Sequence, residues 1–388
     1  METIPLFKPY HTQEEINALI DVMESGWWGL GPKTAEFEKA FAEYIGVNHA
    51  IGMNSCTSAL QVACHLISLS KFNPIVLVPP LSFVSTSHAV LHARATPIFC
   101  DIDPETLCIS PDSIWHYRKR FGWAAVGAVV VVHYGGRCAP IDEIRSAAGD
   151  EAYIIEDCAH ACGASLNGRM AGDLGEIGCF SFHAVKNLAT GDGGMITTNN
   201  TQWMERAKQL RWLGIDKGTF DRSGDPGKYL WEYDCIELGY KCHMNDIQAA
   251  IGLCQLKRLE GINGGRAALA DHYTKLLKDH LEKEVKTPKM DTEDDHSAWH
   301  LYPIRVDAAH RDPLMQYLAD HGVHTGVHYK PITQFKTYKS LYNFDDHKMP
   351  VADEVWKTLI SLPIHPHITT QDIDFIVGCI DEYFHGAK

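Results

Sequence analysis

The stretch IIEDCAHACGA at residues 154–164, followed by GCFSFHAVKNLATGDGGMI at residues 178–196, decides the fold of this chain. In each stretch an apolar run of strand length ends in polar residues and a turn. Glu156 and Asp157 lie at the end of the first run, and Lys186 lies on the turn after the second. Strand ends in a mostly parallel sheet place such groups at one edge, where ligands bind. The two stretches therefore predict a ligand site at the edge of a sheet.

Five further apolar runs accompany these two, and helical segments alternate with them. The seven runs are HAIGM (49–53), IVLVP (75–79), TPIFC (96–100), VGAVVVV (126–132), AYIIE (152–156), IGCFSF (177–182) and GMITT (194–198). Near-continuous apolar strands separated by helices are typical of a parallel sheet covered on both faces. The sequence predicts an α/β fold, with a large domain whose mostly parallel mixed sheet is sandwiched by helices.

The C-terminal third has a different texture. Asn245 is the predicted N-cap of a long helix that leads out of the large domain. A helical pattern then continues to about residue 284, and a strand at 299–306 and helices at 311–321 and 370–384 follow. We expect a large domain at residues 1–265 and a smaller α+β domain at residues 266–388.

Composition and charge exclude several classes of protein. The formal charge of −14 argues against broad binding to nucleic acids or anionic membranes. Twelve cysteines occur without a CxxC pair or zinc-finger spacing, so a reducing cytoplasm is a simpler reading than a disulfide framework. We find neither a secretory signal pattern nor an apolar run long enough to span a bilayer. We expect a cytoplasmic protein that binds no metal, membrane or nucleic acid.

Asp157 and Lys186 together suit one kind of cofactor. A protonated ring nitrogen needs a carboxylate beside it, since the cationic ring can then withdraw electrons from a neighbouring carbanion. A lysine that bonds to an aldehyde must lie on a turn and become neutral readily through burial or nearby positive charge. Each residue alone is more often a helix cap or a solvated side chain, but the two together predict catalysis.

EDCAHACGA and FSFHAVKNLATGDGG resemble the cofactor signatures of the DegT/DnrJ/EryC1/StrS sugar aminotransferases, and the resemblance runs from GPKTAEFEKAFAEYIGV to SLPIHPHIT. It implies an aspartate aminotransferase-like, fold type I protein that uses pyridoxal 5′-phosphate. It also implies a homodimer with shared active sites. By the same resemblance, Lys186 holds the cofactor covalently and Asp157 pairs with its pyridine nitrogen.

The resemblance assigns further cofactor contacts. His160 matches a position that hydrogen-bonds the phenolic oxygen, and Phe83 matches a ring that lies against the cofactor face. The turn Ser55–Cys56–Thr57 opens a helix, so its amides can face a phosphate, and Ser181 adds a hydroxyl. Taken alone, the turn could simply cap its helix, and Phe83 and His160 could be core residues.

Four further contacts are expected, with the cofactor phosphate or with the substrate. ELGYKCHMNDIQAAIGL (237–253) matches a segment that reaches the neighbouring subunit's site. After the Gly-Tyr pair the common family pattern reads Asn-Tyr-Arg, where this chain has Lys241, Cys242 and His243, so the bidentate fork of the arginine is lost. We expect Lys241 to contact the cofactor phosphate from the neighbouring subunit. His243, Gly31 and His328 are the expected substrate contacts, although His328 could equally be a surface histidine.

The resemblance implies transfer of an amino group from L-glutamate to a keto sugar, most simply a nucleotide-linked 4-keto-6-deoxy sugar. A 3-keto sugar, a sugar without a nucleotide or a keto cyclitol remains an alternative acceptor. A sugar dehydratase of the same family would carry histidine in place of Lys186. A non-catalytic regulator would have lost Lys186, Asp157 or the turn at 55–57, and none is lost.

Overall fold

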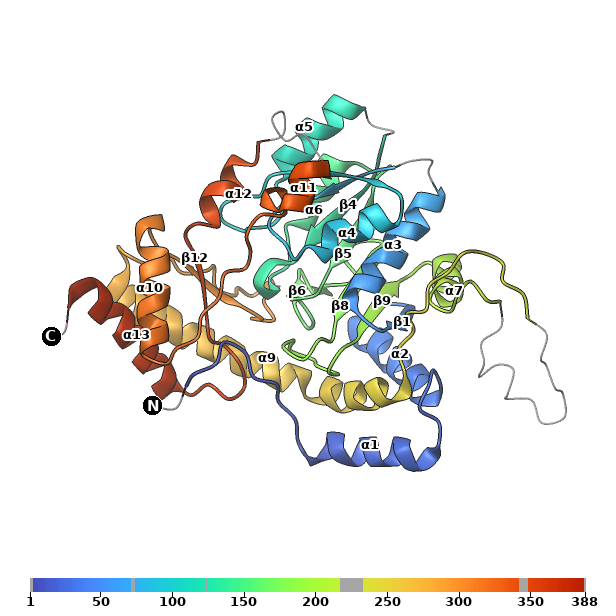
Figure 1. The fold of residues 1–388 in the computed structure, drawn as a ribbon, viewed down its shortest axis with the longest axis horizontal. Helices are drawn as coiled ribbons and strands as arrows, with labels where there is room; N and C mark the ends of the chain where they lie inside the picture. Colours follow the sequence, from blue (N-terminus) through green and yellow to red (C-terminus); the bar gives the residue numbers. More distant parts are fainter. Residues whose placement is uncertain (1–2, 71–73, 123–124, 217–232, 342–347, 387–388) are drawn as a thin grey trace.

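The computed structural model describes residues 3–70, 74–122, 125–216, 233–341 and 348–386. Seven strands form its central sheet in the order β1-β9-β8-β5-β4-β2-β3 (Figure 1). Within this sheet β9 runs antiparallel to β1 and β8, and the other neighbouring strands are parallel. The strands are β1 (His49–Met53), β2 (Ile75–Val78), β3 (Thr96–Phe99), β4 (Val126–Val132), β5 (Tyr153–Asp157), β8 (Ile177–Ser181) and β9 (Gly194–Thr198). Each predicted apolar run forms one of them, which confirms the mostly parallel mixed sheet.

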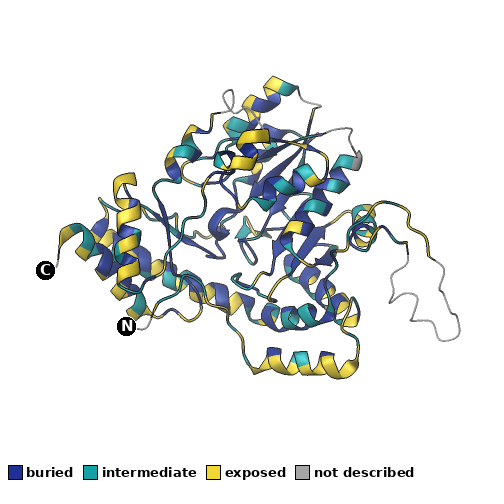
Figure 2. Cartoon of the chain, viewed as in Figure 1, coloured by how far each residue is buried: buried dark blue, intermediate teal, exposed yellow. Residues whose placement is uncertain are grey.

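Helices enclose this sheet, and Figure 2 shows buried strands surrounded by helices whose outer sides are exposed. Helix α3 crosses the sheet and contacts β4, β5, β8 and β9, while α2 packs on β1. The helices are α1 (Gln13–Ser25), α2 (Pro32–Ile45), α3 (Cys56–Ser70), α4 (Ser85–His92), α5 (Pro111–Phe121), α6 (Ile141–Ala148), α7 (Thr201–Leu210), α9 (Asp246–Leu281), α10 (Ala308–Asp320), α11 (Lys336–Leu341), α12 (Pro350–Val355) and α13 (Thr370–His385), with short 3₁₀ turns η1 (Tyr134–Gly136) and η2 (Ile332–Gln334).

Two smaller sheets accompany the central one in the described part of the chain. One is formed by β6 (Ser165–Leu166), β7 (Arg169–Met170) and β10 (Asp295–His296), and the other by β11 (Tyr302–Arg305) and β12 (Leu359–Leu362). A second buried apolar cluster surrounds β11 and β12 and includes Tyr273, Tyr302 and Leu318. Helices α10 and α13 pack beside it, as the α+β pattern of the C-terminal third predicts.

Helix α9 joins the two apolar clusters as one continuous element of 36 residues. Asn245 caps its first turn, as expected, and its side chain accepts a hydrogen bond from the Gln248 amide. The helix contacts α1, α2 and α13, and this packing outweighs the roughly 1 kcal/mol that each internal glycine costs. It passes without a break through residue 265, where we place the end of the large domain. That boundary stays a prediction.

Part of the C-terminal third packs against the core of the seven-stranded sheet. Ile332, Tyr338 and Ala352 belong to the buried cluster around the seven-stranded sheet, not to the second cluster. These contacts bring residues 328 and 329 over the carboxyl edge of the sheet, where β1, β2, β5 and β8 all end. Among the described residues, no helix combines the length and apolarity that crossing a membrane requires.

Candidate active site

A cavity of about 540 Å³ opens at this carboxyl edge. Nine of the twelve predicted site residues line it: Ser55, Cys56, Thr57, Phe83, Asp157, His160, Ser181, Lys186 and His328. They come from segments spread over nearly 275 residues of sequence, and the sheet edge brings them together. The other three, Gly31, Lys241 and His243, lie elsewhere.

Lys186 lies on the turn that follows β8. The turn is closed by backbone hydrogen bonds, in which the Lys186 amide donates to the His183 carbonyl at 2.8 Å and the Thr190 amide donates to the Phe182 carbonyl at 2.8 Å. Burial lowers the pKa of the Lys186 amine to about 8, although the nearby Cys56 and Asp157 act to raise it. A sizeable fraction of the amine is therefore neutral near pH 8, as nucleophilic attack on an aldehyde requires.

Asp157 ends β5 and is buried at the floor of the same cavity. One carboxylate oxygen accepts a hydrogen bond from the Thr86 hydroxyl at 2.8 Å, and the other accepts the Ala159 amide at 3.2 Å. Burial raises the pKa of this carboxyl, while these hydrogen bonds and the charge of Lys186 act in the opposite direction. A cation that entered the cavity would stabilise the ionised form.

His160 lines the cavity and carries an unpaired buried polar atom. Its Nε2 lies 2.9 Å from the Tyr329 hydroxyl, and the two rings stack. Its Nδ1 is buried and has no hydrogen-bond partner among the described residues. Burial and the neighbouring Lys186 and His328 hold the pKa of His160 well below its ordinary value, so the ring is neutral. A buried nitrogen without a partner costs free energy, and a ligand oxygen would satisfy it.

The turn at residues 55–57 forms the start of α3. The first amides of a helix have no acceptor within the helix and lie at the positive end of its dipole. Gly194 on β9 permits this turn, because a Cβ at that position would come within 2.4–2.7 Å of the Ser55 carbonyl group and the Cys56 nitrogen. The cavity wall therefore offers a cradle suited to an anion such as a phosphate.

Gly31, Lys241 and His243 gather around Trp212 instead. The ammonium of Lys241 lies 3.0 Å from the centre of the Trp212 ring, and the His243 ring centre lies 4.4 Å from it. Gly31 and Trp212 line a second cavity of about 380 Å³. Within one chain, these three residues do not reach the cavity that holds Lys186. Their predicted roles in the cofactor or substrate site stay predictions that require a second copy of the chain.

Sequence reasoning missed several residues of the site. Thr86 and Ser82 hold the Asp157 side, with their hydroxyls 2.7 Å apart, and Tyr329 pairs with His160. Ser82 and Thr86 lie within three residues of the predicted Phe83, and Tyr329 follows the predicted His328. Their closeness in sequence to predicted site residues could have identified them. His300 contacts Lys186 from the segment just before β11, and no local pattern pointed to it.

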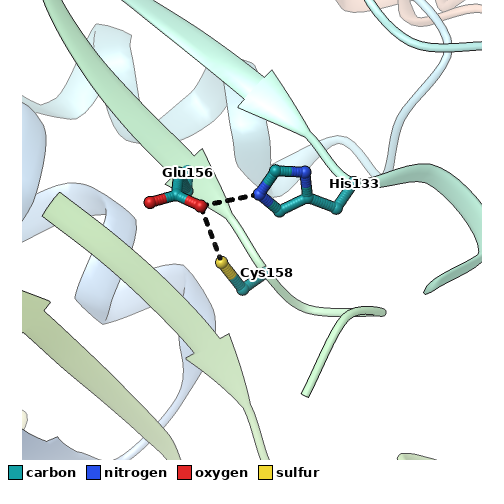
Figure 3. A group of neighbouring side chains, drawn as sticks. All are labelled: His133, Glu156 and Cys158. Carbon is teal, nitrogen blue, oxygen red and sulfur yellow. Dashed lines mark hydrogen bonds and ion pairs between the residues drawn. The ribbon is translucent and has the colours of Figure 1, made fainter. Parts of the chain in front are cut away.

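Buried His133, Glu156 and Cys158 form a cluster of metal-ligating types beside the strand ends of β4 and β5 (Figure 3). The Nε2 of His133 lies 2.8 Å from Glu156, and its Nδ1 accepts the Ala139 amide at 3.0 Å. Glu156 also accepts the amides of residues 172 and 175 at 2.8 and 2.6 Å. Burial raises the pKa of Cys158 well above its usual value, so it remains a thiol that can donate to Glu156. The cluster is thus a hydrogen-bonded network that fixes two strand ends.

A larger cavity of about 670 Å³ lies between residues 104–107, 134–143 and 278–305 and contains none of the predicted site residues. Ion pairs cross its wall, such as Lys286 with Glu105 at 2.5 Å and Arg137 with Asp295 at 2.7 Å. Tyr134 connects the two regions, because its hydroxyl donates to the His328 carbonyl. Lys186 and Asp157, whose pKa values are shifted by burial, line the smaller cavity. We therefore place the candidate active site there.

The residues of the smaller cavity fit pyridoxal phosphate. A covalent partner for its aldehyde is present in the Lys186 amine, and a carboxylate for its ring nitrogen is present in Asp157. The unpaired Nδ1 of His160 suits the phenolic oxygen, and the first turn of α3 suits the phosphate. The thiol of Cys56 lies 3.9 Å from Asp157, and burial and this carboxylate raise its pKa while the charge of Lys186 lowers it.

Residues 9–381 match the sequence model of the DegT/DnrJ/EryC1/StrS aminotransferase family. The chain is 34% identical over 390 residues to the spore coat polysaccharide biosynthesis protein SpsC of Bacillus subtilis, and the match covers 99% of this chain and 98% of SpsC.

Solved structures agree with this match. The PMP form of Spr1654 from Streptococcus pneumoniae superposes with a TM-score of 0.89 at 27% identity, over 97% of this chain and 98% of Spr1654. Its PLP form superposes with a TM-score of 0.88. The sugar aminotransferase CalS13 from Micromonospora echinospora superposes with a TM-score of 0.86 at 28% identity, over 98% of this chain and 99% of CalS13.

Proposed function

Because the chain belongs to the DegT/DnrJ/EryC1/StrS aminotransferase family, we propose that it moves an amino group from L-glutamate to a nucleotide-linked 4-keto-6-deoxy sugar. The family makes it a pyridoxal-phosphate-dependent sugar aminotransferase. One observation supports the proposal most strongly: the amine of Lys186 and the carboxylate of Asp157 line the same cavity, between an anion cradle and an unpaired imidazole nitrogen.

Pyridoxal phosphate, when bound, supplies an electron-withdrawing ring that stabilises negative charge on the carbon attached to the donor nitrogen. In the proposed mechanism, Lys186 Nζ would take the proton from the α-carbon of glutamate and hold it for return to the carbon on the other side of the donor nitrogen. Asp157 would pair with the positively charged ring nitrogen, and Thr86, whose hydroxyl donates to Asp157, orients that carboxylate. A lysine whose pKa is lowered to about 8 can serve as base and acid in turn. Water would supply the carbonyl oxygen of 2-oxoglutarate, and release of this product before the sugar binds would give ping-pong kinetics.

The same residues bear on the alternative functions. A 3-keto sugar, a sugar without a nucleotide and a keto cyclitol would use identical amine chemistry, so they remain alternative acceptors. A dehydratase is disfavoured, since Lys186 occupies the turn where such relatives carry histidine. A non-catalytic regulator is disfavoured because the pKa of Lys186 is lowered by burial in a cavity that also holds Asp157.

A homodimer with shared sites is part of the proposal. Helix α1 exposes Ile16, Ile20 and Met23 along one face, and Trp28 follows nearby with half of its surface exposed. Exposed apolar side chains that cluster in this way mark interaction surfaces. The backbone of Trp28 also accepts a hydrogen bond from the Asp246 amide, so this surface adjoins the start of α9. A second copy on this face would bury the apolar stripe.

Incubation of the cofactor-loaded enzyme with amino donors and keto sugars tests the function. With L-glutamate alone we expect a stoichiometric burst of 2-oxoglutarate and then no turnover, because the nitrogen stays on the enzyme. Adding a nucleotide-linked 4-keto-6-deoxy sugar should restart turnover and give an amino sugar, identified by mass spectrometry. L-alanine and L-aspartate serve as control donors. Amination of only a 3-keto sugar or cyclitol would replace the proposed acceptor, and loss of a sugar hydroxyl without amination would establish a dehydratase.

Subunit complementation tests the shared site. We expect Lys186→Ala and Lys241→Ala homodimers each to be strongly impaired. Co-expression of the two variants should recover about a quarter of wild-type activity, since half of randomly formed dimers are mixed and each mixed dimer has one complete site. Size-separated dimers carrying two different tags provide the measurement. An active Lys241→Ala homodimer, or mixed dimers without recovered activity, would refute a role for Lys241 across the interface.

A further inference from the structure

We propose that His300 is a positioning residue for Lys186, whose amine donates a hydrogen bond to the His300 Nε2 whenever it is not bonded to the cofactor. The inference rests on the proposed catalytic role of Lys186. It concerns where the freed amine lies, and it assigns no bond-forming step to the histidine.

The contact joins two elements that are 114 residues apart in the chain. Lys186 Nζ lies 3.3 Å from His300 Nε2, and His300 lies just before β11 with 2% of its surface exposed. His300 is absent from the cavity lining, whereas Lys186 is part of it. The imidazole therefore contacts the amine from outside the cavity lining, with its ring centre 4.6 Å from that of His160.

Asn187 fixes which nitrogen of His300 carries the proton. The Asn187 amide nitrogen donates to the Asn263 side chain at 2.8 Å and to the Ala298 carbonyl at 2.6 Å. The Asn187 oxygen consequently faces His300 Nδ1, at 3.2 Å. A carbonyl oxygen can only accept, so Nδ1 carries the hydrogen and Nε2 presents its lone pair to Lys186.

His300 stays neutral, which keeps it an acceptor. Burial holds its pKa well below the ordinary value, and the neighbouring Lys186, His160, Arg266 and His328 lower it further. Phe7 stacks on the His300 ring with the ring centres 5.5 Å apart. No carboxylate contributes to the shift of this imidazole among the described residues, so nothing there favours a charged ring.

This arrangement directs the amine. With one N–H held by His300, the freed amine points its remaining hydrogens and its lone pair toward the cavity, where the substrate α-carbon would lie. The same hydrogen bond stabilises the protonated form of Lys186, alongside Cys56 and Asp157, which also raise its pKa against the effect of burial. Removal of the acceptor should lower the pKa of Lys186 and increase the freedom of its side chain.

The test measures the pKa of Lys186 in the protein without cofactor. The rate at which an amine-acylating reagent modifies Lys186 is followed by peptide mass spectrometry from pH 6 to 10. We expect His300→Phe to lower this pKa by about one unit, because a hydrogen bond to a charged group is lost. His300→Gln should stay close to wild type, since its carbonyl oxygen can accept from Lys186 while its amide donates to Asn187. In turnover, His300→Phe should lower kcat about tenfold with little change in KM for the donor.

His365→Phe is the matched control. His365 is also buried, but its Nε2 lies 3.0 Å from the Pro5 carbonyl and has no contact with Lys186. An unchanged Lys186 pKa in His300→Phe, or an equal shift in His365→Phe, would overturn the proposal. Failure of the proposed function is separate: borohydride reduction of the loaded enzyme would then attach no cofactor to Lys186.

A measurement on the unaltered chain covers the case in which the variants fail to fold. Neutron diffraction of the wild-type protein should place hydrogen on His300 Nδ1 and none on Nε2. Hydrogen on Nε2 would contradict the assigned direction of the bond.

Discussion

Replacement of Lys186 by alanine is expected to abolish transamination, with turnover at least about 10⁴-fold lower than in the wild type, since both the covalent attachment and the proton transfer are lost. The visible absorption of the lysine-bound cofactor should disappear as well. Steady-state assays and absorption spectra give the measurement. Lys330→Ala, which removes a lysine that lies outside the cavity lining, is the control and should retain activity.

The difference in stability between the wild type and Lys186→Ala should depend on pH. Burial lowers the pKa of Lys186 to about 8 in the folded protein, from an ordinary value of 10.5. Between these values the unfolded chain binds more protons than the folded chain, so the free energy of unfolding rises with pH across this window. Alanine lacks this titration. The cofactor-free wild type should therefore gain stability relative to Lys186→Ala between about pH 8 and pH 10.5. A constant difference in urea unfolding would mean that the amine is not buried in the folded state.

Replacement of Asp157 by asparagine is expected to separate catalysis from stability. Turnover should fall by about 10²- to 10³-fold, because the charge that stabilises the cationic ring nitrogen is removed. Cofactor binding should weaken for the same reason. Side-chain size and the hydrogen bond from Thr86 can be retained, so the variant tests charge alone.

The cofactor-free Asp157→Asn protein should be at least as stable as the wild type. Burial raises the pKa of Asp157, so the folded protein holds this proton more tightly than the unfolded chain, and stability declines as pH rises above the ordinary value of 3.8. Asparagine does not carry this penalty at pH 7. Thermal unfolding with and without cofactor provides the measurement, and exposed Asp150→Asn is the control. Unimpaired turnover would mean that another group pairs with the ring nitrogen.

The local sequence pattern was sufficient to predict the seven strands and the positions of Asp157 and Lys186. All of the seven strands except the edge strand β3 are buried on both faces nearly throughout, and such strands show their identity in a window of four to seven residues. Asp157 and Lys186 could be placed because Asp157 ends β5 and Lys186 lies on the turn after β8. The turn at 55–57 could be placed because it opens a helix after a strand.

Helix α9 shows where local pattern was incomplete. The helical patterns before and after residue 265 each have their own buried partners, and the glycines at 261, 264 and 265 weaken any local signal that joins them. Contacts with α2 at one end and α13 at the other hold the helix straight through that region. These contacts are long-range, and a window of sequence does not contain them.

By itself, the sequence determined the strand set, the edge of the sheet that carries the site, and the amine and carboxylate that meet there, because strand periodicity and strand ends are local properties. Tertiary structure alone decided that Thr86 holds Asp157, that Tyr329 pairs with His160 and that His300 contacts Lys186. It also decided that Lys241 turns away from its own chain's cavity and lies over Trp212. The physical reason is that these contacts join strands and loops whose separation in space is fixed by sheet pairing and helix packing, which no single segment encodes.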